Sequence, residues 1–311
     1  MSRQTTIDHQ PQRTYAAVLA AMAVAAAAGF WMSLTSPEVP GTETLTLEDG
    51  VDAVAIMLFG VLGVALVARD RAAGLGRALV LMASMIALDY LLGGLADAIA
   101  GGHTNPPDAA RILNVASESA FIAAFFLLAL SPLLLFPTGR LPSRRWRWVA
   151  GAGITGCGVS VVSVLLAPGL VDEDVPAWGD NPIGLDAAPG LIDALETVGA
   201  VLLVGGIVAG LAAFVTRWVR YRGPRRHQMA WFTIGVVVQV TGLATDTSGD
   251  SVTIEVLVAL AIFGTMLFGI GWPLLGPLGQ RAEAAEHLTW ATSEQEPVSR
   301  SVSGSRPTLD A

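Results

Sequence analysis

The sequence lacks lysine altogether and carries little charge of either sign. All 18 basic residues are arginine, and charged residues make up 14% of the 311 positions, against about 25% in an average soluble domain. Hydrophobic residues make up 53%. This composition excludes an ordinary water-soluble domain, because so much apolar surface needs a solvent other than water.

Cysteine and histidine are scarce as well, and their scarcity excludes several kinds of site. Cys157 is the single cysteine, so an intrachain disulfide is impossible. The four histidines are scattered, and none has a metal-ligand spacing with another histidine or with the cysteine. The chain has no Walker-type phosphate loop and no HExxH motif. We therefore predict no enzymatic activity, no catalytic residue, no cofactor and no metal site.

What the sequence has instead is a series of eight long apolar runs. A helix needs about 20 apolar residues to cross a hydrocarbon core of about 30 Å, and lipid requires that each spanning backbone satisfy its own hydrogen bonds. The runs are Tyr15–Leu34, Val51–Ala68, Ala78–Ala100, Ile112–Phe136, Trp148–Pro168, Leu195–Thr216, Met229–Thr245 and Val252–Leu274. They predict an all-α, polytopic integral membrane protein of about eight transmembrane helices.

The arginines predict the orientation of these spans. Seventeen of the 18 fall in alternate segments, which is typical of the cytoplasmic side, and only Arg111 falls on the other side. Both termini are therefore predicted to be cytoplasmic, in a multi-pass protein of the plasma membrane. We divide the chain into a cytoplasmic segment 1–14, a transmembrane domain 15–276 and a disordered cytoplasmic tail 277–311. A cleaved signal sequence at the first run is the alternative, and it would leave seven spans in the same orientation.

The predicted outer loops are acidic. The longest, 169–194, carries six aspartates and glutamates and no basic residue. These acids lack a calcium-type spacing, so we expect a solvated loop. Glu196, near the outer end of the sixth run, is likewise expected to reach water.

Carboxylates inside the predicted spans are the best pointer to function, because charge within lipid is expensive. Asp89 and Asp97 lie in the third run, and Glu118 lies in the fourth. Asp97 and Glu118 enter from the outer side at similar depth, so their carboxyls could meet and share a proton. We predict these three residues as a sensing or proton-linked site. The alternative is that each is a structural, hydrogen-bonded acid.

Glycines mark the predicted helix contacts. Gly206 and Gly210 form a small-xxx-small step in the sixth run, and four glycines line the fifth. Small residues let helix backbones approach closely. The pattern favours packing within the chain over dimerisation.

Two predicted cytoplasmic loops hold clusters of arginine beside the membrane. We expect them to contact anionic inner-leaflet lipids, where each arginine gains about 1 kcal/mol; the alternative is that they only anchor the topology. The residues are Arg140, Arg144, Arg145, Arg147, Arg217, Arg220, Arg222, Arg225 and Arg226.

The same two loops carry a resemblance to a known family. Residues 133–147 read LLLFPTGRLPSRRWR, residues 181–184 read NPIG, and residues 220–231 read RYRGPRRHQMAW. In this order, with apolar runs between them, they resemble phrases in the membrane-embedded N-terminal sensor region of actinobacterial histidine kinases. Thr138 stands where that family usually has an acid. The resemblance covers roughly residues 115–245.

The resemblance implies a signalling function without catalysis. In that family the last span leads to a linker, a phosphoacceptor helix and an ATP-binding domain. Only 35 residues, 277–311, follow the transmembrane domain here, and His287 has no phosphoacceptor-like context. We expect a sensor or accessory membrane subunit with a separate cytoplasmic signalling partner or kinase, and no nucleic acid partner. The alternatives are a small ion- or proton-coupled transporter and a truncated remnant of a kinase gene.

Overall fold

The computed structural model describes residues 10–42, 47–244, 264, 267–276 and 284. The named α-helices among them are α1 (Gln10–Thr35), α2 (Leu47–Ala68), α3 (Ala73–Ala100), α4 (Asp108–Leu135), α5 (Trp146–Leu165), α6 (Pro189–Arg220) and α7 (Pro224–Ala244). A turn of 3-10 helix, η1 (Pro176–Trp178), lies between α5 and α6, and residues 267–275 are helical. These residues contain no β-strand, so the described part of the chain is all-helical as predicted.

Six of these helices, α1 to α6, are long and apolar enough to cross a membrane. This agrees with a helical membrane protein. The sequence predicts two further spans. The seventh, Met229–Thr245, corresponds to α7, which is not among the six. The eighth, Val252–Leu274, lies mostly outside the described residues, and only its last part is seen as helix.

Each of the seven named α-helices begins two to six residues before the apolar run that predicted it. Helix α4 starts at Asp108 and α6 at Pro189, where the sequence suggested starts at Ile112 and Leu195. The added turns carry polar residues that an apolar run leaves out. Pro189 occupies the first turn of α6, where its missing N–H has no intrahelical partner to lose. Helices that extend past the apolar core are expected where the chain reaches the polar interface.

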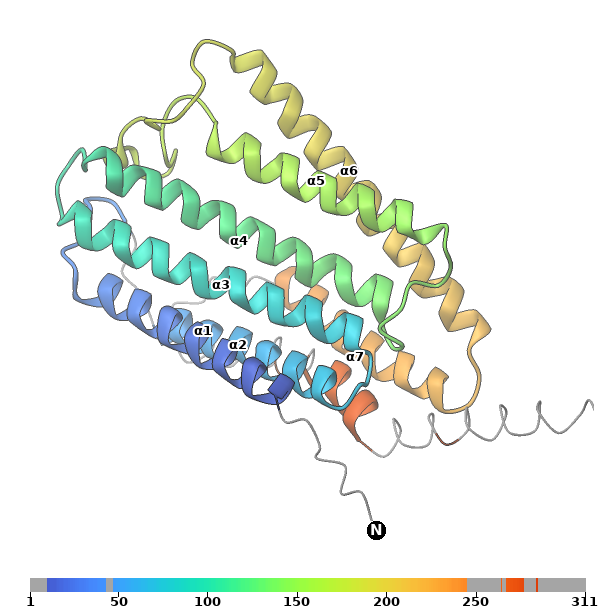
Figure 1. Cartoon of the computed structure of the whole chain (residues 1–311). Coiled ribbons are helices and arrows are strands. Elements are labelled where there is room, and N and C mark those ends of the chain that lie inside the picture. Colours follow the sequence, from blue (N-terminus) through green and yellow to red (C-terminus); the bar gives the residue numbers. More distant parts are fainter. Residues whose placement is uncertain (1–9, 43–46, 245–263, 265–266, 277–283, 285–311) are drawn as a thin grey trace, which may run out of the picture.

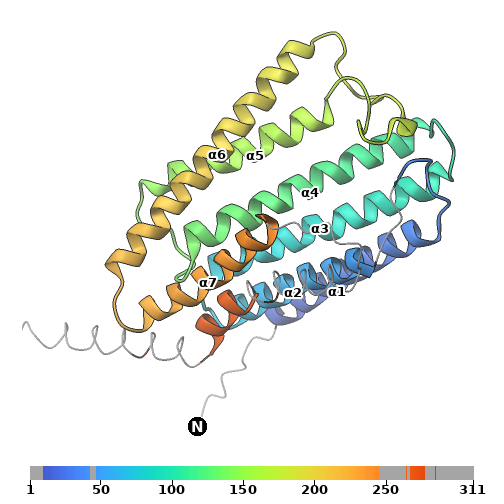
Figure 2. The ribbon, with the colours of Figure 1, turned by 180° about the vertical axis from the view of Figure 1, so that it is seen from behind.

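Helix α3 lies at the centre of one half of the bundle. It packs against α1, α2 and α4, and the antiparallel pair of α5 and α6 packs on α4 from the other side (Figure 1). The view from behind shows α7 and the short helix 267–275 lying across α2, α3 and α4 near one end (Figure 2). Helix α4 therefore joins the two halves of the molecule.

Glycine pairs bring α3 very close to its neighbours. A Cβ added to Gly76 would lie 2.6 Å from the carbonyl oxygen of Gly63 on α2, and a Cβ on Gly63 would lie equally close to that of Gly76. Gly94 of α3 is similarly pressed against Gly29 of α1. Backbone-to-backbone contact at these crossings leaves no room for a methyl group.

The α5–α6 interface is built on the predicted small residues. A Cβ on Gly206 would lie 3.3 Å from the Cα atom of Gly153, and one on Gly156 would lie 2.9 Å from the Cβ atom of Leu202. Gly210 faces Leu133 of α4. These glycines therefore pack within the chain, as the sequence favoured. Gly151 and Gly158, by contrast, face open space.

The bundle has two chemically different ends. The arginine end holds the loops 69–72, 136–145 and 221–223, and the acidic end holds the loops 36–42, 101–107 and 166–188. At the arginine end, Arg71 Nη1 donates to the Leu274 carbonyl at 3.1 Å. At the acidic end, the Asn105 N–H donates to the Ala177 carbonyl at 2.9 Å. The described arginines other than Arg111 lie at the arginine end, which is the segregation the sequence predicts.

Candidate functional site: an acidic cavity and a buried arginine joint

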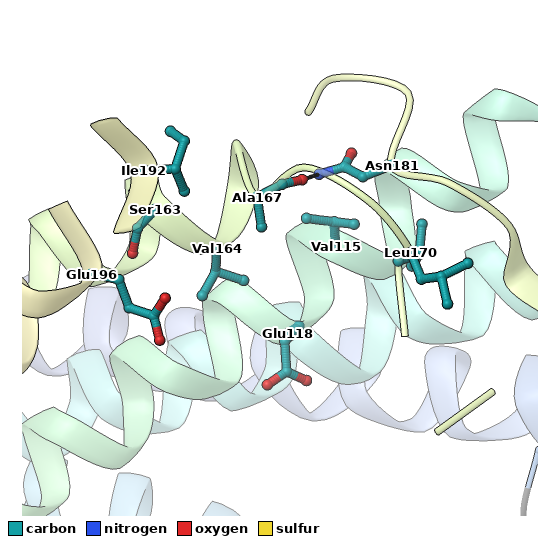
Figure 3. A pocket seen from close by; sticks show the side chains of 10 residues that line it. Val115, Glu118, Ser163, Val164, Ala167, Leu170, Asn181, Ile192 and Glu196 are labelled. Atoms are coloured by element: carbon teal, nitrogen blue, oxygen red, sulfur yellow. Dashed lines mark hydrogen bonds between the residues drawn. The ribbon is translucent and has the colours of Figure 1, made fainter. Parts of the chain in front are cut away.

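A cavity of about 210 Å³ opens between α4, α5 and α6 near the acidic end. Its polar lining consists of Glu118, Ser163, Asn181 and Glu196, and its other six lining residues are aliphatic. Glu118 lies ten residues into α4, roughly 15 Å from the start of the helix at 1.5 Å per residue. Figure 3 shows the Glu118 and Glu196 carboxylates turned away from the loop, with Val164 between them.

The loop 166–188 forms the roof of this cavity. Four of its five acids are exposed, as expected for a solvated loop, but the loop also has a fixed fold. Val175 and Trp178 are buried against Ala96, Ala100 and Ala110 of α3 and α4. Asp172 Oδ1 accepts hydrogen bonds from the N–H groups of Asp174 and Val175 at 2.8 and 3.2 Å. An Asx turn and a small apolar core therefore fix a segment that looks merely polar in sequence.

Arg111, the one arginine at the acidic end among the described residues, ties this loop to α4. Its Nη1 donates to the Asp180 carbonyl at 3.0 Å, and its Nη2 pairs with Asp108 Oδ1 at 2.7 Å. The exception to the predicted arginine asymmetry thus has a local structural role.

Asn181, part of the NPIG segment, fastens the loop to the end of α5. Its Nδ2 donates to the carbonyls of Leu165 and Ala167 at 3.1 and 2.9 Å, and its Oδ1 accepts from the Ile183 N–H at 3.2 Å. The side chain is 6% exposed. A terminal helix carbonyl needs such a donor because the helix itself offers none. The bond to Ala167 is drawn in Figure 3.

The cavity is negatively charged. Glu118 and Glu196 line it, no basic side chain does, and the Asp172 carboxylate lies near enough to repel that of Glu118. Glu118 and Glu196 are both exposed, so Glu196 can reach water as the sequence predicts, and it also lines this cavity.

Asp89 and Asp97 have different surroundings from Glu118. Asp89 lies near the middle of α3 and accepts a hydrogen bond from Ser117 Oγ of α4 at 2.6 Å. Asp97 faces α1, where it interacts with Ser33. The anticipated pairing of Asp97 with Glu118 is therefore not formed, because the two carboxylates point toward different neighbours. The structure therefore does not bring the three predicted acids into a single site, although Asp89 lies near enough to Glu118 for their charges to interact.

At the arginine end, Arg217 of α6 is buried, with 4% of its surface exposed. Its Nη1 and Nη2 donate to the carbonyls of Phe136 and Leu133 at the end of α4, and its Nε donates to the Ala213 carbonyl at 3.3 Å. The sequence grouped Arg217 with the basic residues expected to contact lipid head groups; it lies at that end of the bundle, but its burial contradicts the lipid contact. A guanidinium enclosed by helix carbonyls does not contact lipid head groups.

Proline explains why the Leu133 carbonyl needs Arg217. In an α-helix this oxygen would accept the N–H of residue 137, but residue 137 is proline and has no N–H. The guanidinium supplies the missing donor from a different helix. We call the contact of Arg217 with Leu133 and Phe136 the arginine joint.

A second helix end close by also precedes a proline, and its unpaired carbonyl also accepts a hydrogen bond from a side chain of another helix. Residue 277 is proline, so the Pro273 carbonyl has no donor four residues on. Gln228 Nε2 of α7 donates to it at 2.9 Å, and the Gln228 side chain is buried. The segments FPTGR and RYRGPRRHQMAW thus contain residues that terminate or cap helices.

Aromatic rings surround the arginine joint. Phe136 stacks on Phe232 of α7 with ring centroids 4.8 Å apart, and Phe214 of α6 lies 5.3 Å from Phe232. The joint therefore connects α4, α6 and α7 in one packed unit.

The other predicted basic residues lie at the surface of the arginine end. Arg225 is half-buried, with its guanidinium 5.6 Å from the centre of the Tyr221 ring. The remaining seven are exposed, and they are Arg140, Arg144, Arg145, Arg147, Arg220, Arg222 and Arg226.

Sequence reasoning missed Ser117, Asn181 and Ser163 as parts of these sites. A neutral polar residue in an apolar run gives a weak signal, because it can bond to its own helix. The partner of Leu133 did have a usable signal, namely a proline placed four residues after a helix carbonyl. Within the described residues, no group of three or more histidine, cysteine, aspartate or glutamate side chains could hold a metal ion.

Comparison of the chain with protein-family models, curated proteins and solved structures finds no match.

Proposed function

We propose that this chain is an eight-span protein of the cell membrane with both termini in the cytoplasm, acting as a non-catalytic sensor or accessory subunit for a separate cytoplasmic signalling partner. The single observation that carries the proposal is that the same two helices, α4 and α6, line the acidic cavity at one end and form the arginine joint at the other. A shift of α4 relative to α6 at the cavity has to be accommodated at the joint, because a helix moves largely as a unit.

The exposed arginines supply a surface for the output of such a shift. Arg144 and Arg145 lie in the loop that follows the joint residue Phe136, and Arg220 and Arg222 lie just beyond Arg217. A displacement of the joint would move both loops together. A stimulus can drive this displacement only through its difference in affinity for the two arrangements.

The test is purification of the protein from native membranes in mild detergent, with identification of the associated proteins by mass spectrometry. We expect a histidine kinase or another cytoplasmic signalling protein in near-stoichiometric yield. A variant with Arg144→Gln and Arg145→Gln should lose this partner. A control with Arg69→Gln and Arg77→Gln, which removes the same charge from exposed positions of another segment, should keep it.

A wild-type protein that purifies without any signalling partner would contradict the proposal. Loss of the partner from both variants would show that the contact depends on net charge rather than on the loop that follows the joint.

A carrier of protons or cations is the second candidate, and the acidic cavity favours it. Carboxylates within a span suit proton or cation relays. Reconstitution into proteoliposomes with a pH-sensitive dye in the lumen would test it. A flux that Glu118→Gln abolishes would support a carrier, whereas proteoliposomes as tight as protein-free vesicles would exclude proton transport.

A further inference from the structure

The acidic cavity presents hydrogen-bond acceptors and no free donor from its side chains. Ser163 Oγ donates its proton to the Ser160 carbonyl at 2.9 Å, and both Nδ2 donors of Asn181 are used by Leu165 and Ala167. Ser163 and Asn181 are 2% and 6% exposed, so these hydrogen bonds are largely shielded from solvent. The carboxylates of Glu118 and Glu196 accept only, as long as they are ionised. A ligand that fits this lining must donate hydrogen bonds and carry positive charge.

The aliphatic residues of the cavity lining and the cavity volume indicate which class of cation fits. Six of the ten lining residues are aliphatic, which suits an apolar body rather than a hydrated inorganic ion. No three-residue metal-ligand group occurs among the described residues. The cavity of about 210 Å³ is smaller than the range of about 300–1,000 Å³ usual for drug-sized ligands. An ammonium group is a pure donor with three N–H bonds, and it matches an acceptor-only site.

We propose that the cavity between α4, α5 and α6 binds the ammonium group of a small amine with an apolar body, with the carboxylates of Glu118 and Glu196 in its lining as the acceptors. The amine comes either from a free amphipathic molecule or from the head group of an amine-bearing lipid. This inference deepens the proposed function, on which it rests, by naming the class of stimulus.

The first experiment measures binding of benzylamine by equilibrium dialysis to the full chain in phosphatidylcholine nanodiscs. Benzyl alcohol, which has the same ring and no charge, is the matched neutral probe. We expect benzylamine to bind at least about tenfold more tightly than the alcohol, because hydrogen bonds to charged groups are the stronger ones. Glu118→Gln and Glu196→Gln should each weaken benzylamine binding by about tenfold or more and leave benzyl alcohol unaffected.

Glu173→Gln is the control. Glu173 is an exposed acid of the loop 166–188 that roofs the cavity, but its own side chain does not line the cavity. It should bind benzylamine like the wild type. Thermal unfolding of each variant checks that the fold is intact, and neither cavity glutamate has an ion-pair partner among the described residues that its replacement would orphan. Equal binding of benzylamine by the wild type and both glutamine variants would overturn a free-amine site.

The second arm identifies a lipid as the source. The protein is moved to nanodiscs that contain phosphatidylethanolamine, whose head group keeps its N–H donors, whereas phosphatidylcholine has none. If the lipid occupies the cavity, phosphatidylethanolamine remains bound in native mass spectrometry, and Glu118→Gln releases it. The inference would be overturned if neither benzylamine binding nor phosphatidylethanolamine retention changed when the cavity glutamates were replaced. Copurification of the cytoplasmic partner is measured separately, so failure of the amine site and failure of the signalling proposal can be told apart.

Discussion

Arg217 is a charged residue whose surroundings are made of carbonyl oxygens. Its hydrogen bonds to Leu133 and Phe136 replace donors that the end of α4 does not have. A buried acceptor left without a donor costs about 1–3 kcal/mol. The contribution of Arg217 to stability therefore depends on its being the donor at this position, and less on its being a cation near a membrane.

We expect Arg217→Gln to lower the free energy of unfolding by about 2–5 kcal/mol, because it shortens the side chain and leaves up to two carbonyls unsatisfied. Arg220→Gln, an exposed arginine one turn further along α6, should change stability little. Thermal unfolding in the same detergent, followed by circular dichroism, measures both. Equal losses from the two variants would mean that the joint contributes nothing beyond charge.

Asp89 and Ser117 form a polar contact between α3 and α4 in the predicted interior of the membrane. Asp89→Asn keeps an oxygen that accepts from Ser117 while removing the negative charge, so we expect stability close to wild type. Ser117→Ala removes the donor and should cost about 1 kcal/mol. Unfolding measurements on both variants test this difference.

The same pair separates a structural role from a signalling role. If Asp89 senses the stimulus through its charge, Asp89→Asn changes the activity of the cytoplasmic partner without loss of folded protein. An unchanged response to the stimulus would show that Asp89 is only a structural hydrogen-bond acceptor.

At the scale of helices, two glycines in similar sequence settings should respond to the same change with opposite sign. Gly76→Ala places a methyl group against the backbone of α2 and should destabilise the protein by about 1–3 kcal/mol. Gly158 on α5 faces open space, so a methyl group fits there. Gly158→Ala should stabilise the helix by about 0.5–1 kcal/mol, since alanine is the better helix former. Midpoints of thermal unfolding for the two variants provide the comparison. A stabilising Gly76→Ala would show that the α2–α3 crossing is looser than described.

Apolar runs predicted the six span-length helices of the described residues, and arginine positions predicted the two chemically different ends of the bundle, because hydropathy and charge act on every residue of a span. Helix starts at Asp108 and Pro189 were missed, since polar turns outside the apolar core do not enter a hydropathy run. The acidic cavity was missed for another reason. Glu118 and Glu196 are 78 positions apart in the chain, and only the crossing of α4 and α6 brings them to one cavity.

At the scale of the whole molecule, the single cysteine makes the orientation testable. In a Cys157→Ser background, Glu173→Cys places one thiol at the acidic end and Arg144→Cys places one at the arginine end. Both positions are exposed. A membrane-impermeant maleimide should label the first variant in intact cells and the second only after the membrane is permeabilised. The reverse pattern would invert the proposed topology, and labelling of both in intact cells would contradict a membrane-spanning bundle.

The arginine joint also sets an order for how the protein is made. The Leu133 carbonyl leaves the ribosome 84 residues before the arginine that completes it, which is roughly 4–17 s at about 5–20 residues per second. During that interval only water or a lipid head group can hydrogen-bond the Leu133 carbonyl. We therefore expect this end of α4 to stay at the aqueous edge of the insertion machinery. The arrival of α6 then expels that water. Assembly of the second half of the bundle is thus a late dehydration step. In a chain released before residue 217, the Leu133 carbonyl would remain hydrated.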